Sequence, residues 1–227
     1  MSVTSTLPRR SRRKDARPGE LLDAAFELFV EHGYAATRVE AVAQRAGVSK
    51  GTLFLYFPSK EELFKAVVRH RLSSLFVNWN AEFEAFEGSS AEMVRYAVHQ
   101  WWQHVGGTAA SGIAKLVMTE AHQFPEIADF YQNEVIEPGN ALLRRILSRG
   151  MERGEFRRVN LDYGIYGLIA PMTMLLLWKH GMSPCCRPGF VLDPHAFLEA
   201  QTEMLLNGLS QPLTTARTAA RQTGSVK

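Results

Sequence analysis

The chain has 227 residues, is 46% hydrophobic and carries a formal net charge of +3. This length allows a sizeable core, and two adjacent cysteines, Cys185 and Cys186, exclude a disulfide-stapled fold and fit a reducing compartment. Residues 1–71 hold 13 Lys/Arg against 8 Asp/Glu, whereas residues 72–227 hold 13 against 15. The basic N-terminal end fits either a polyanionic partner or a solvated tail.

The first elements are a basic arm and an amphipathic helix. Residues 1–16 contain "RRSRRK" and show no apolar periodicity, so we expect a disordered arm. From Pro18, apolar residues recur at three- and four-residue spacing, which predicts a helix with one buried face. Gly33 is a suitable C-terminal cap for this helix.

Two short helices are predicted next, on either side of Gly47. Thr37 and Glu40 have the spacing of a capping box, which predicts a helix start at Thr37. Ser49 is a good N-cap for the second helix, and Gly47 can take the left-handed conformation that a tight turn needs. The pattern is that of a helix-turn-helix.

The second short helix of this motif has an outer face suited to DNA. In a helix-turn-helix the N-terminal part of the second helix enters the major groove. Lys50 can reach a guanine edge or a phosphate, Thr52 can lie against a thymine methyl, and Tyr56 and Lys60 suit phosphate contacts. The predicted DNA-contacting residues are Thr37, Arg38, Ser49, Lys50, Gly51, Thr52, Phe54, Tyr56 and Lys60.

The rest of the chain also has a helical pattern. A second capping box, Ser59 with Glu62, predicts a long amphipathic helix. Further helices are predicted over 91–105, 111–123, 125–150 with a kink near Pro138, 161–180 after Asn160, and 194–208. No stretch shows sustained strand alternation, so the sequence predicts about nine helices and an all-α fold.

The stretch "ELFVEHGYAATRVEAVAQRAGVSKGTLFLYFPSKEELF", residues 27–64, resembles the DNA-binding region of the TetR/AcrR family of bacterial regulators. The family usually has a tyrosine where Phe54 stands. Residues 124–156 resemble a segment common among relatives that control efflux. The resemblance implies a homodimeric, ligand-responsive regulator, most often a repressor. It implies a helix-turn-helix domain over 17–64, a ligand-binding and dimerisation domain over 65–210 and a loose tail over 211–227.

Three interpretations compete for residues 72–210: a ligand-binding domain, an enzyme, or a scaffold for an architectural DNA-binding dimer. The enzyme is disfavoured because zinc-protease, nucleotide-binding and nucleophile-elbow motifs are absent, and the histidines lack metal-ligand spacing. We therefore expect no catalysis and no cofactor. Aromatic, methionine and histidine side chains on several helices favour a small apolar effector. The predicted ligand-binding residues are Trp79, Phe83, Trp101, His104, Met118, His122 and Tyr131.

The last two helices carry the predicted dimer interface. Residues 161–180 are apolar nearly all round, and 194–209 present an apolar stripe, so one pair from each subunit could form a four-helix bundle. The predicted interface residues are Leu175, Trp178, Phe197, Met204 and Leu205.

The apolar run 167–178 is too short to span a bilayer and no signal peptide is visible, so we expect a cytoplasmic protein away from membranes. A redox switch at Cys185 and Cys186 is the remaining alternative to a ligand.

Overall fold

The computed structural model describes residues 18–182 and 191–210, and this part of the chain is helical apart from loops and an isolated bridge between Phe156 and Ser210. The all-α prediction is confirmed. The α-helices are α1 Pro18–Ala36, α2 Val39–Arg45, α3 Lys50–Tyr56, α4 Lys60–Val68, α5 Ser74–Glu84, α6 Ser90–Trp101, α7 Ser111–Glu120, α8 Pro125–Tyr131, α9 Glu137–Glu152, α10 Leu161–Leu177 and α11 Pro194–Leu209. The predicted arm and tail, and both cysteines, lie outside the described residues.

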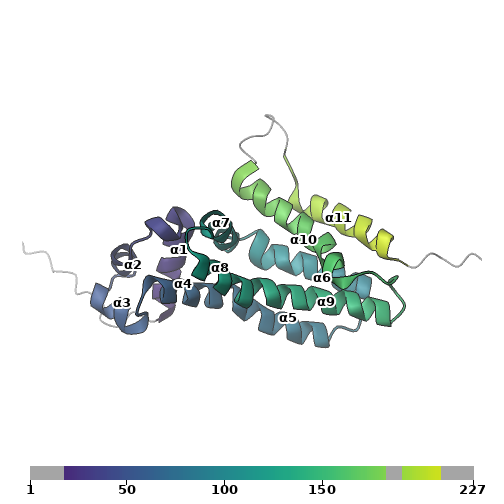
Figure 1. Cartoon of the computed structure of the whole chain (residues 1–227), viewed down its shortest axis with the longest axis horizontal. Helices are drawn as coiled ribbons and strands as arrows, with labels where there is room; N and C mark the ends of the chain where they lie inside the picture. Colours follow the sequence, from purple (N-terminus) through teal and green to yellow (C-terminus); the bar gives the residue numbers. More distant parts are fainter. Residues whose placement is uncertain (1–17, 183–190, 211–227) are drawn as a thin grey trace, which may run out of the picture.

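Four short π-helical segments extend the α-helices: η1 Arg69–Ser73, η2 Trp102–Gly106, η3 Gln132–Ile136 and η4 Trp178–Met182. η1 joins α4 to α5, so residues 60–84 form one helical rod that runs from the small N-terminal part into the larger part (Figure 1). η3 joins α8 to α9 in the same way, in the turn before Pro138. Single π turns inside helices often accompany functional sites, because they widen the helix locally.

The small N-terminal part is packed around a cluster of rings. Phe29 lies edge-on to Phe64 with ring centroids 5.3 Å apart, and Tyr34 contacts Phe124 at 4.8 Å. Phe29 and Phe64 come from α1 and α4, whereas Phe124 directly precedes α8. Buried side chains of α7 and α8 belong to the same core as those of α1–α4. The DNA-binding motif therefore rests on helices of the larger part.

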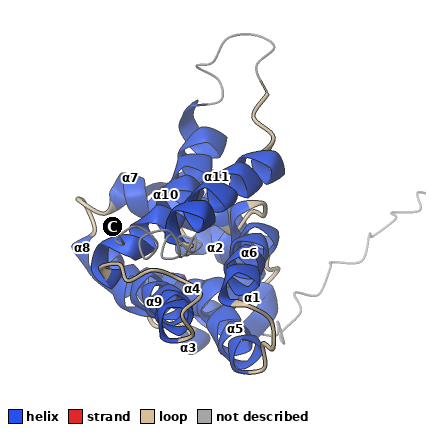
Figure 2. Cartoon of the chain, turned by 90° about the vertical axis from the view of Figure 1, so that its right-hand side faces the viewer, coloured by secondary structure: helices blue, strands red, loops and turns tan. Residues whose placement is uncertain are grey.

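A second core lies at the other end of the molecule. It contains buried side chains of α6, α9, α10 and α11. Viewed along the long axis, α10 and α11 lie side by side on one flank of the bundle formed by the other helices (Figure 2). Among the described residues, one face of α10 and one face of α11 stay uncovered by other helices.

Several helix starts agree with the sequence and one does not. Ser49, Ser59, Asn160 and Asp193 each accept a hydrogen bond from a backbone N–H of the following helix, as predicted. The predicted cap at Thr37 is wrong: α2 begins after Arg38, and no side chain caps it.

A complete capping box occurs instead at the start of α6. Ser89 accepts from the Glu92 backbone N–H, and the Glu92 carboxylate accepts from the Ser89 backbone N–H. The sequence predicted this helix only from residue 91, so its cap was missed.

The apolar helix at the end of the bundle is longer than the run considered in the sequence. Leu161–Met182 spans 22 residues and is apolar enough to cross a membrane by length and composition, a test that core helices of water-soluble proteins also pass. Here the helix packs on α9, α11 and α7. Its inner side belongs to the second core, through Ile165, Leu168 and Leu175.

Candidate DNA-binding surface and ligand cavity

The turn before α3 fixes the orientation of that helix. Gly47 has a φ of +73°, the left-handed conformation expected from the sequence. The Ser49 hydroxyl oxygen accepts from the Thr52 N–H at 3.0 Å, which holds the first turn of α3. Leu53 is fully buried against α1 and α2, so the opposite side of α3 faces solvent.

Lys50 lies at the exposed start of α3. Its ammonium group is 2.6 Å from a carboxylate oxygen of Glu40 on α2 and 5.6 Å from the centre of the Phe54 ring. The hydrogen bond from Lys50 lowers the pKa of the Glu40 carboxyl. Both side chains are largely exposed, so this ion pair contributes little stability and leaves Lys50 able to reach DNA.

Leu55 is a residue of this surface that the sequence analysis missed. Its side chain is 85% exposed, while its neighbours Phe54 and Tyr56 are also exposed. A large apolar side chain on a short exposed helix is a suitable partner for a thymine methyl group. The signal was present in the sequence, because Leu55 is out of phase with the buried Leu53 and the half-buried Phe57.

Two predicted DNA-contacting residues turn inward instead. Thr37 is only 3% exposed, and its hydroxyl donates to the carbonyls of Leu28 at 3.0 Å and Gly33 at 2.6 Å. The Lys60 ammonium donates to the carbonyls of Tyr34 at 2.9 Å, Ala35 at 3.2 Å and Thr37 at 3.3 Å. Both side chains bond backbone carbonyls in the C-terminal half of α1 and at Thr37, so they do not belong to the proposed DNA contacts.

Replacing Lys50 with alanine should weaken binding to the preferred duplex by about 1–3 kcal/mol and relax base preference, because the side chain that reaches a base edge is lost. Thermal stability should change little, since the contact with Glu40 is exposed. Lys65→Ala is the control, because Lys65 lies on α4 between Glu61 and Glu62 and over the Phe130 ring. Fluorescence anisotropy with the preferred and scrambled duplexes measures both effects, and equal losses for the two variants would contradict a role for Lys50.

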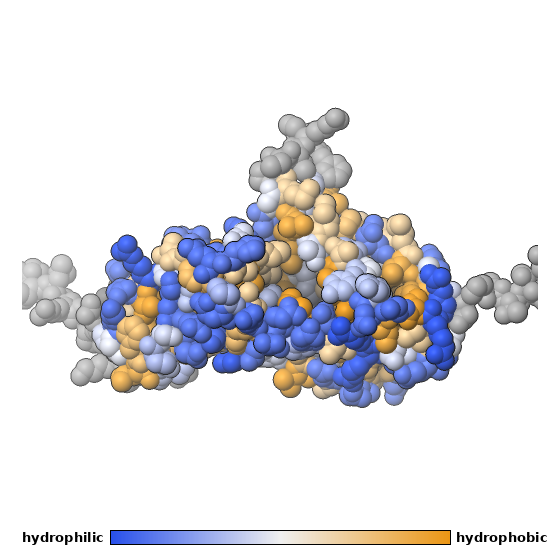
Figure 3. All heavy atoms as spheres, in the orientation of Figure 1, coloured by the Kyte–Doolittle hydropathy of each residue, from blue (hydrophilic) through white to orange (hydrophobic). Residues whose placement is uncertain are grey.

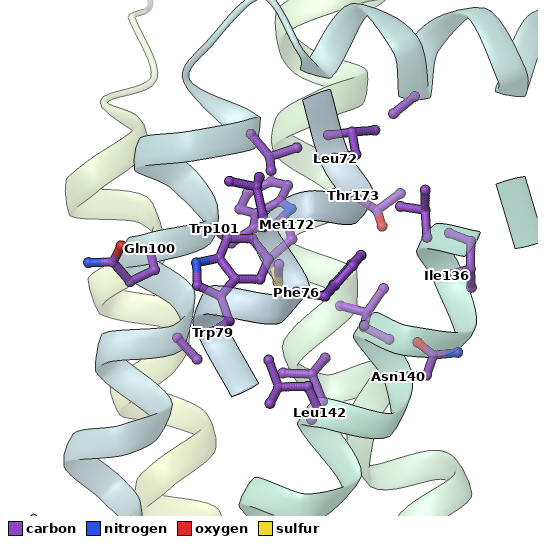
Figure 4. Close-up of a pocket in the computed structure, with 18 of the residues that line it drawn as sticks. Leu72, Phe76, Trp79, Gln100, Trp101, Ile136, Asn140, Leu142, Met172 and Thr173 are labelled. Atoms are coloured by element: carbon purple, nitrogen blue, oxygen red, sulfur yellow. The ribbon is translucent and has the colours of Figure 1, made fainter. Parts of the chain in front are cut away.

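The larger part encloses an apolar cavity of about 520 Å³. Helices α5, α6, α7, α8, α9 and α10 supply its walls, and Trp79, Trp101, Met172 and Phe76 converge on its centre (Figure 4). Three of the four π-helical segments also contribute, through Leu72, Val105 and Val135 among others.

Five of the seven predicted ligand-binding residues line this cavity: Trp79, Phe83, Trp101, Met118 and Tyr131. The two histidines do not. His104 is exposed and its Nδ1 lies 3.0 Å from the Gln100 carbonyl oxygen, and His122 is exposed in the turn after α7. The sequence analysis missed the contribution of α10, which it assigned to the dimer interface. Asn140 was also missed, although an amide among the apolar positions of a helix is a visible signal.

The predicted interface residues occupy different environments. Leu175 is 1% exposed within the chain, so it belongs to the core and not to a surface, which corrects its assignment. Leu205 is half-buried against Gly167 of α10, and Trp178 and Phe197 are half-buried. Met204 is 68% exposed. Other large exposed apolar side chains on α10 are Tyr163, Tyr166 and Leu177, and apolar atoms are visible on the projecting ridge of α10 and α11 (Figure 3).

Two family models match this chain in succession. Residues 21–67 match the model described as "Bacterial regulatory proteins, tetR family", which covers α2 and α3 and most of α1 and α4. Residues 87–184 match the model described as "Tetracyclin repressor-like, C-terminal domain", which covers α6 to α10. Together the two models cover more than half of the chain.

Individual relatives agree with these models. The regulator RutR from Escherichia coli is 41% identical over 91 residues, which are 40% of this chain and 41% of RutR, so the match spans less than half of the relative. The structure of FadR from Bacillus subtilis with stearoyl-CoA has a TM-score of 0.67 at 19% identity, covering 85% of this chain and 100% of that chain. A regulator from Saccharomonospora viridis in complex with choline has a TM-score of 0.70 at 18% identity, covering 86% and 98%. The structural likenesses concern the fold alone. The two family models show that this chain belongs to the TetR family of bacterial regulatory proteins.

Proposed function

We propose that the protein is a homodimeric, sequence-specific DNA-binding transcriptional regulator, acting as a repressor that releases its operator when a small apolar molecule enters the cavity. The observation that carries the DNA-binding part is the outer face of α3, with Lys50, Phe54, Leu55 and Tyr56 exposed and Thr52 half-buried on a helix held by a capped turn. Family membership supports the same conclusion. Leu55 and Thr52 would contact base edges, and Tyr56 would contact phosphate.

Selection of DNA from a random duplex library tests this part. A dimer should enrich a roughly palindromic sequence whose half-sites are about 34–36 Å apart, the spacing of successive major grooves. Binding without any enriched sequence would favour the architectural alternative, and no binding at moderate salt would contradict DNA recognition by this chain.

The dimer is proposed from the ridge of α10 and α11. A helix with apolar side chains on its exposed face is normally covered by a partner, and the family resemblance supports a second copy of the chain. The interface would involve Tyr163, Tyr166, Leu177 and Met204, which are exposed in the single chain.

Replacing Met204 with glutamate should therefore dissociate the dimer, because the charge would have to be buried in an apolar interface. Size-exclusion chromatography with light scattering should report a folded monomer and weaker DNA binding. Val77→Glu is the matched control, since Val77 is equally exposed but lies on α5. An undisturbed Met204→Glu dimer would show that the interface lies elsewhere.

The effector is proposed from the cavity and from its position. The α4–η1–α5 rod contributes Leu72, Phe76 and Trp79 to the cavity wall and ends in the DNA-binding part. A ligand that favours one tilt of this rod would shift the separation of the two α3 helices. The resulting change in DNA affinity is limited by how much more tightly the ligand binds one tilt of the rod than the other. The redox alternative concerns cysteines outside the described residues.

A second route joins the cavity to the DNA-binding part. Glu120 ends α7, and its two carboxylate oxygens accept from the backbone N–H groups of Tyr34 at 2.9 Å and Ala35 at 2.7 Å. Val117 and Met118, in the preceding turn, line the cavity. Since Lys60 holds the carbonyls of the same segment, the link between α1 and α2 is held from α7 on one side and from α4 on the other. We infer that displacement of α7 by a ligand is transmitted through Glu120.

A further inference from the structure

The cavity wall contains two buried polar side chains without hydrogen-bond partners in the described part of the chain. Tyr131 on α8 is 9% exposed and Asn140 on α9 is 7% exposed, and both line the cavity. By contrast, the buried Ser111 donates to the Thr108 carbonyl and accepts from Lys179. No polar atom of Tyr131 or Asn140 is among the fully buried, unpaired side-chain atoms of the described residues, so both groups remain reachable from the cavity and can take a hydrogen-bond partner there.

The same wall carries little charge. Among the described residues that line the cavity, Glu82 is charged, and arginine, lysine and histidine do not occur. Glu82 is exposed and accepts a hydrogen bond from the Tyr96 hydroxyl at 3.0 Å. The nearby Arg145 is exposed, donates to Asn80 and Glu84 and lies over the outside of the Phe83 ring. A buried carboxylate or phosphate would therefore lack a cationic partner, which makes its burial costly.

Tyr131 and Asn140 have complementary properties as ligand partners. Burial raises the pKa of the Tyr131 hydroxyl, so this group stays protonated and can both donate and accept. The Asn140 amide also offers a donor and an acceptor. They lie on the consecutive helices α8 and α9, and Figure 4 shows Asn140 on the α9 wall of the space. Each group matches a neutral oxygen function, such as a hydroxyl or a carbonyl, and because they lie nine residues apart on the α8–η3–α9 rod they offer two separate positions for it.

We propose that the cavity binds a neutral, mainly apolar molecule bearing a hydroxyl or carbonyl group that is hydrogen-bonded by Tyr131 or by Asn140, and that it rejects the corresponding carboxylate. This inference rests on the proposed ligand-responsive function and specifies its ligand class. It separates this chain from the structural neighbour that was solved with stearoyl-CoA, an anionic thioester. The volume of about 520 Å³ is in the range of small-molecule pockets.

A set of ten-carbon probes with different head groups tests the proposal: 1-decanol, 2-decanone, decanoate and decyltrimethylammonium. Binding to the full chain is measured below the micelle concentration at pH 8 by titration calorimetry and by tryptophan fluorescence, since Trp79 and Trp101 line the cavity. We expect 1-decanol and 2-decanone to bind at least about 10-fold more tightly than decanoate. Either Tyr131→Phe or Asn140→Leu should weaken 1-decanol binding by about 3–10-fold, the effect of one lost hydrogen bond, according to which position holds the hydroxyl.

Asn78→Leu is the control, because Asn78 is exposed on α5 outside the cavity lining and should leave 1-decanol binding unchanged. Thermal unfolding verifies that each variant is folded, and Asn140→Ser replaces Asn140→Leu if the latter is not.

Tighter binding of decanoate or decyltrimethylammonium would overturn the neutral-ligand inference alone. Unchanged 1-decanol affinity in both polar variants would show that Tyr131 and Asn140 are satisfied by water. Failure of all four probes to bind would overturn the ligand-responsive function itself, whereas DNA selection would still test the DNA-binding part.

Discussion

Replacing Phe64 with alanine should lower the free energy of unfolding by about 3–5 kcal/mol, the range for deletion of a fully buried phenylalanine. Phe64 is fully buried on α4, lies edge-on to Phe29 of α1 and contacts the Tyr34 ring at 5.5 Å. Its removal leaves a void between the helices that support α3. Chemical denaturation followed by circular dichroism measures the loss, and DNA affinity should fall with it.

Leu55→Ala provides the contrasting case in the same domain. Leu55 is exposed on α3, so its removal should change unfolding by no more than about 0.5 kcal/mol, the usual range for surface substitutions. Its effect should appear in DNA binding instead. If Phe64→Ala were as stable as Leu55→Ala, the ring cluster could not be the support of the DNA-binding part.

The second large effect is expected at Glu120. In the wild type a bound effector should change DNA affinity by about 5–150-fold, the usual range of coupling between two sites. Glu120→Gln keeps the size of the side chain but replaces one carboxylate oxygen with a donor, so it cannot accept from both Tyr34 and Ala35. We expect 1-decanol to bind the variant with nearly wild-type affinity. It should, however, change the DNA affinity of the variant by less than about threefold.

The control is Glu126→Gln on α8, which removes the same charge from an exposed side chain shortly after α7. Anisotropy of a labelled duplex, titrated with protein at zero and saturating 1-decanol, gives the coupling for each variant. Full coupling in Glu120→Gln would show that the signal travels through the α4–η1–α5 rod without α7. Loss of coupling in both variants would indicate a nonspecific effect of charge.

The sequence predicted those features of the fold that depend on neighbouring residues. Caps at Ser49 and Asn160 and the turn at Gly47 were visible because each follows from one side chain or one backbone angle. The inward positions of Thr37 and Lys60 could not be predicted, because both depend on carbonyls left free by the kink at Gly33 in α1. Their polar side chains resemble those of DNA-contacting residues.

The cavity was predictable only in part for a similar reason. Trp79, Trp101 and Met118 could be selected by residue type, but the lining also depends on which face of α10 turns inward. A helix that is apolar nearly all round does not reveal this, since cavity-lining, core and interface positions are all apolar. Leu175 was therefore assigned to the interface and Met172 was not assigned to the cavity.

The proposed mechanism requires that a ligand in the cavity changes the separation of the two α3 helices in the dimer. A spin label at Gln44→Cys, exposed on α2, reports it by pulsed electron resonance once Cys185 and Cys186 are replaced by serine. We expect one defined distance between the spin labels of the two subunits. This distance should shift by roughly 2–5 Å when 1-decanol fills the cavity, the scale of helix shifts in switching proteins. An unchanged distance in protein shown by calorimetry to be saturated with 1-decanol would contradict the proposed mechanism.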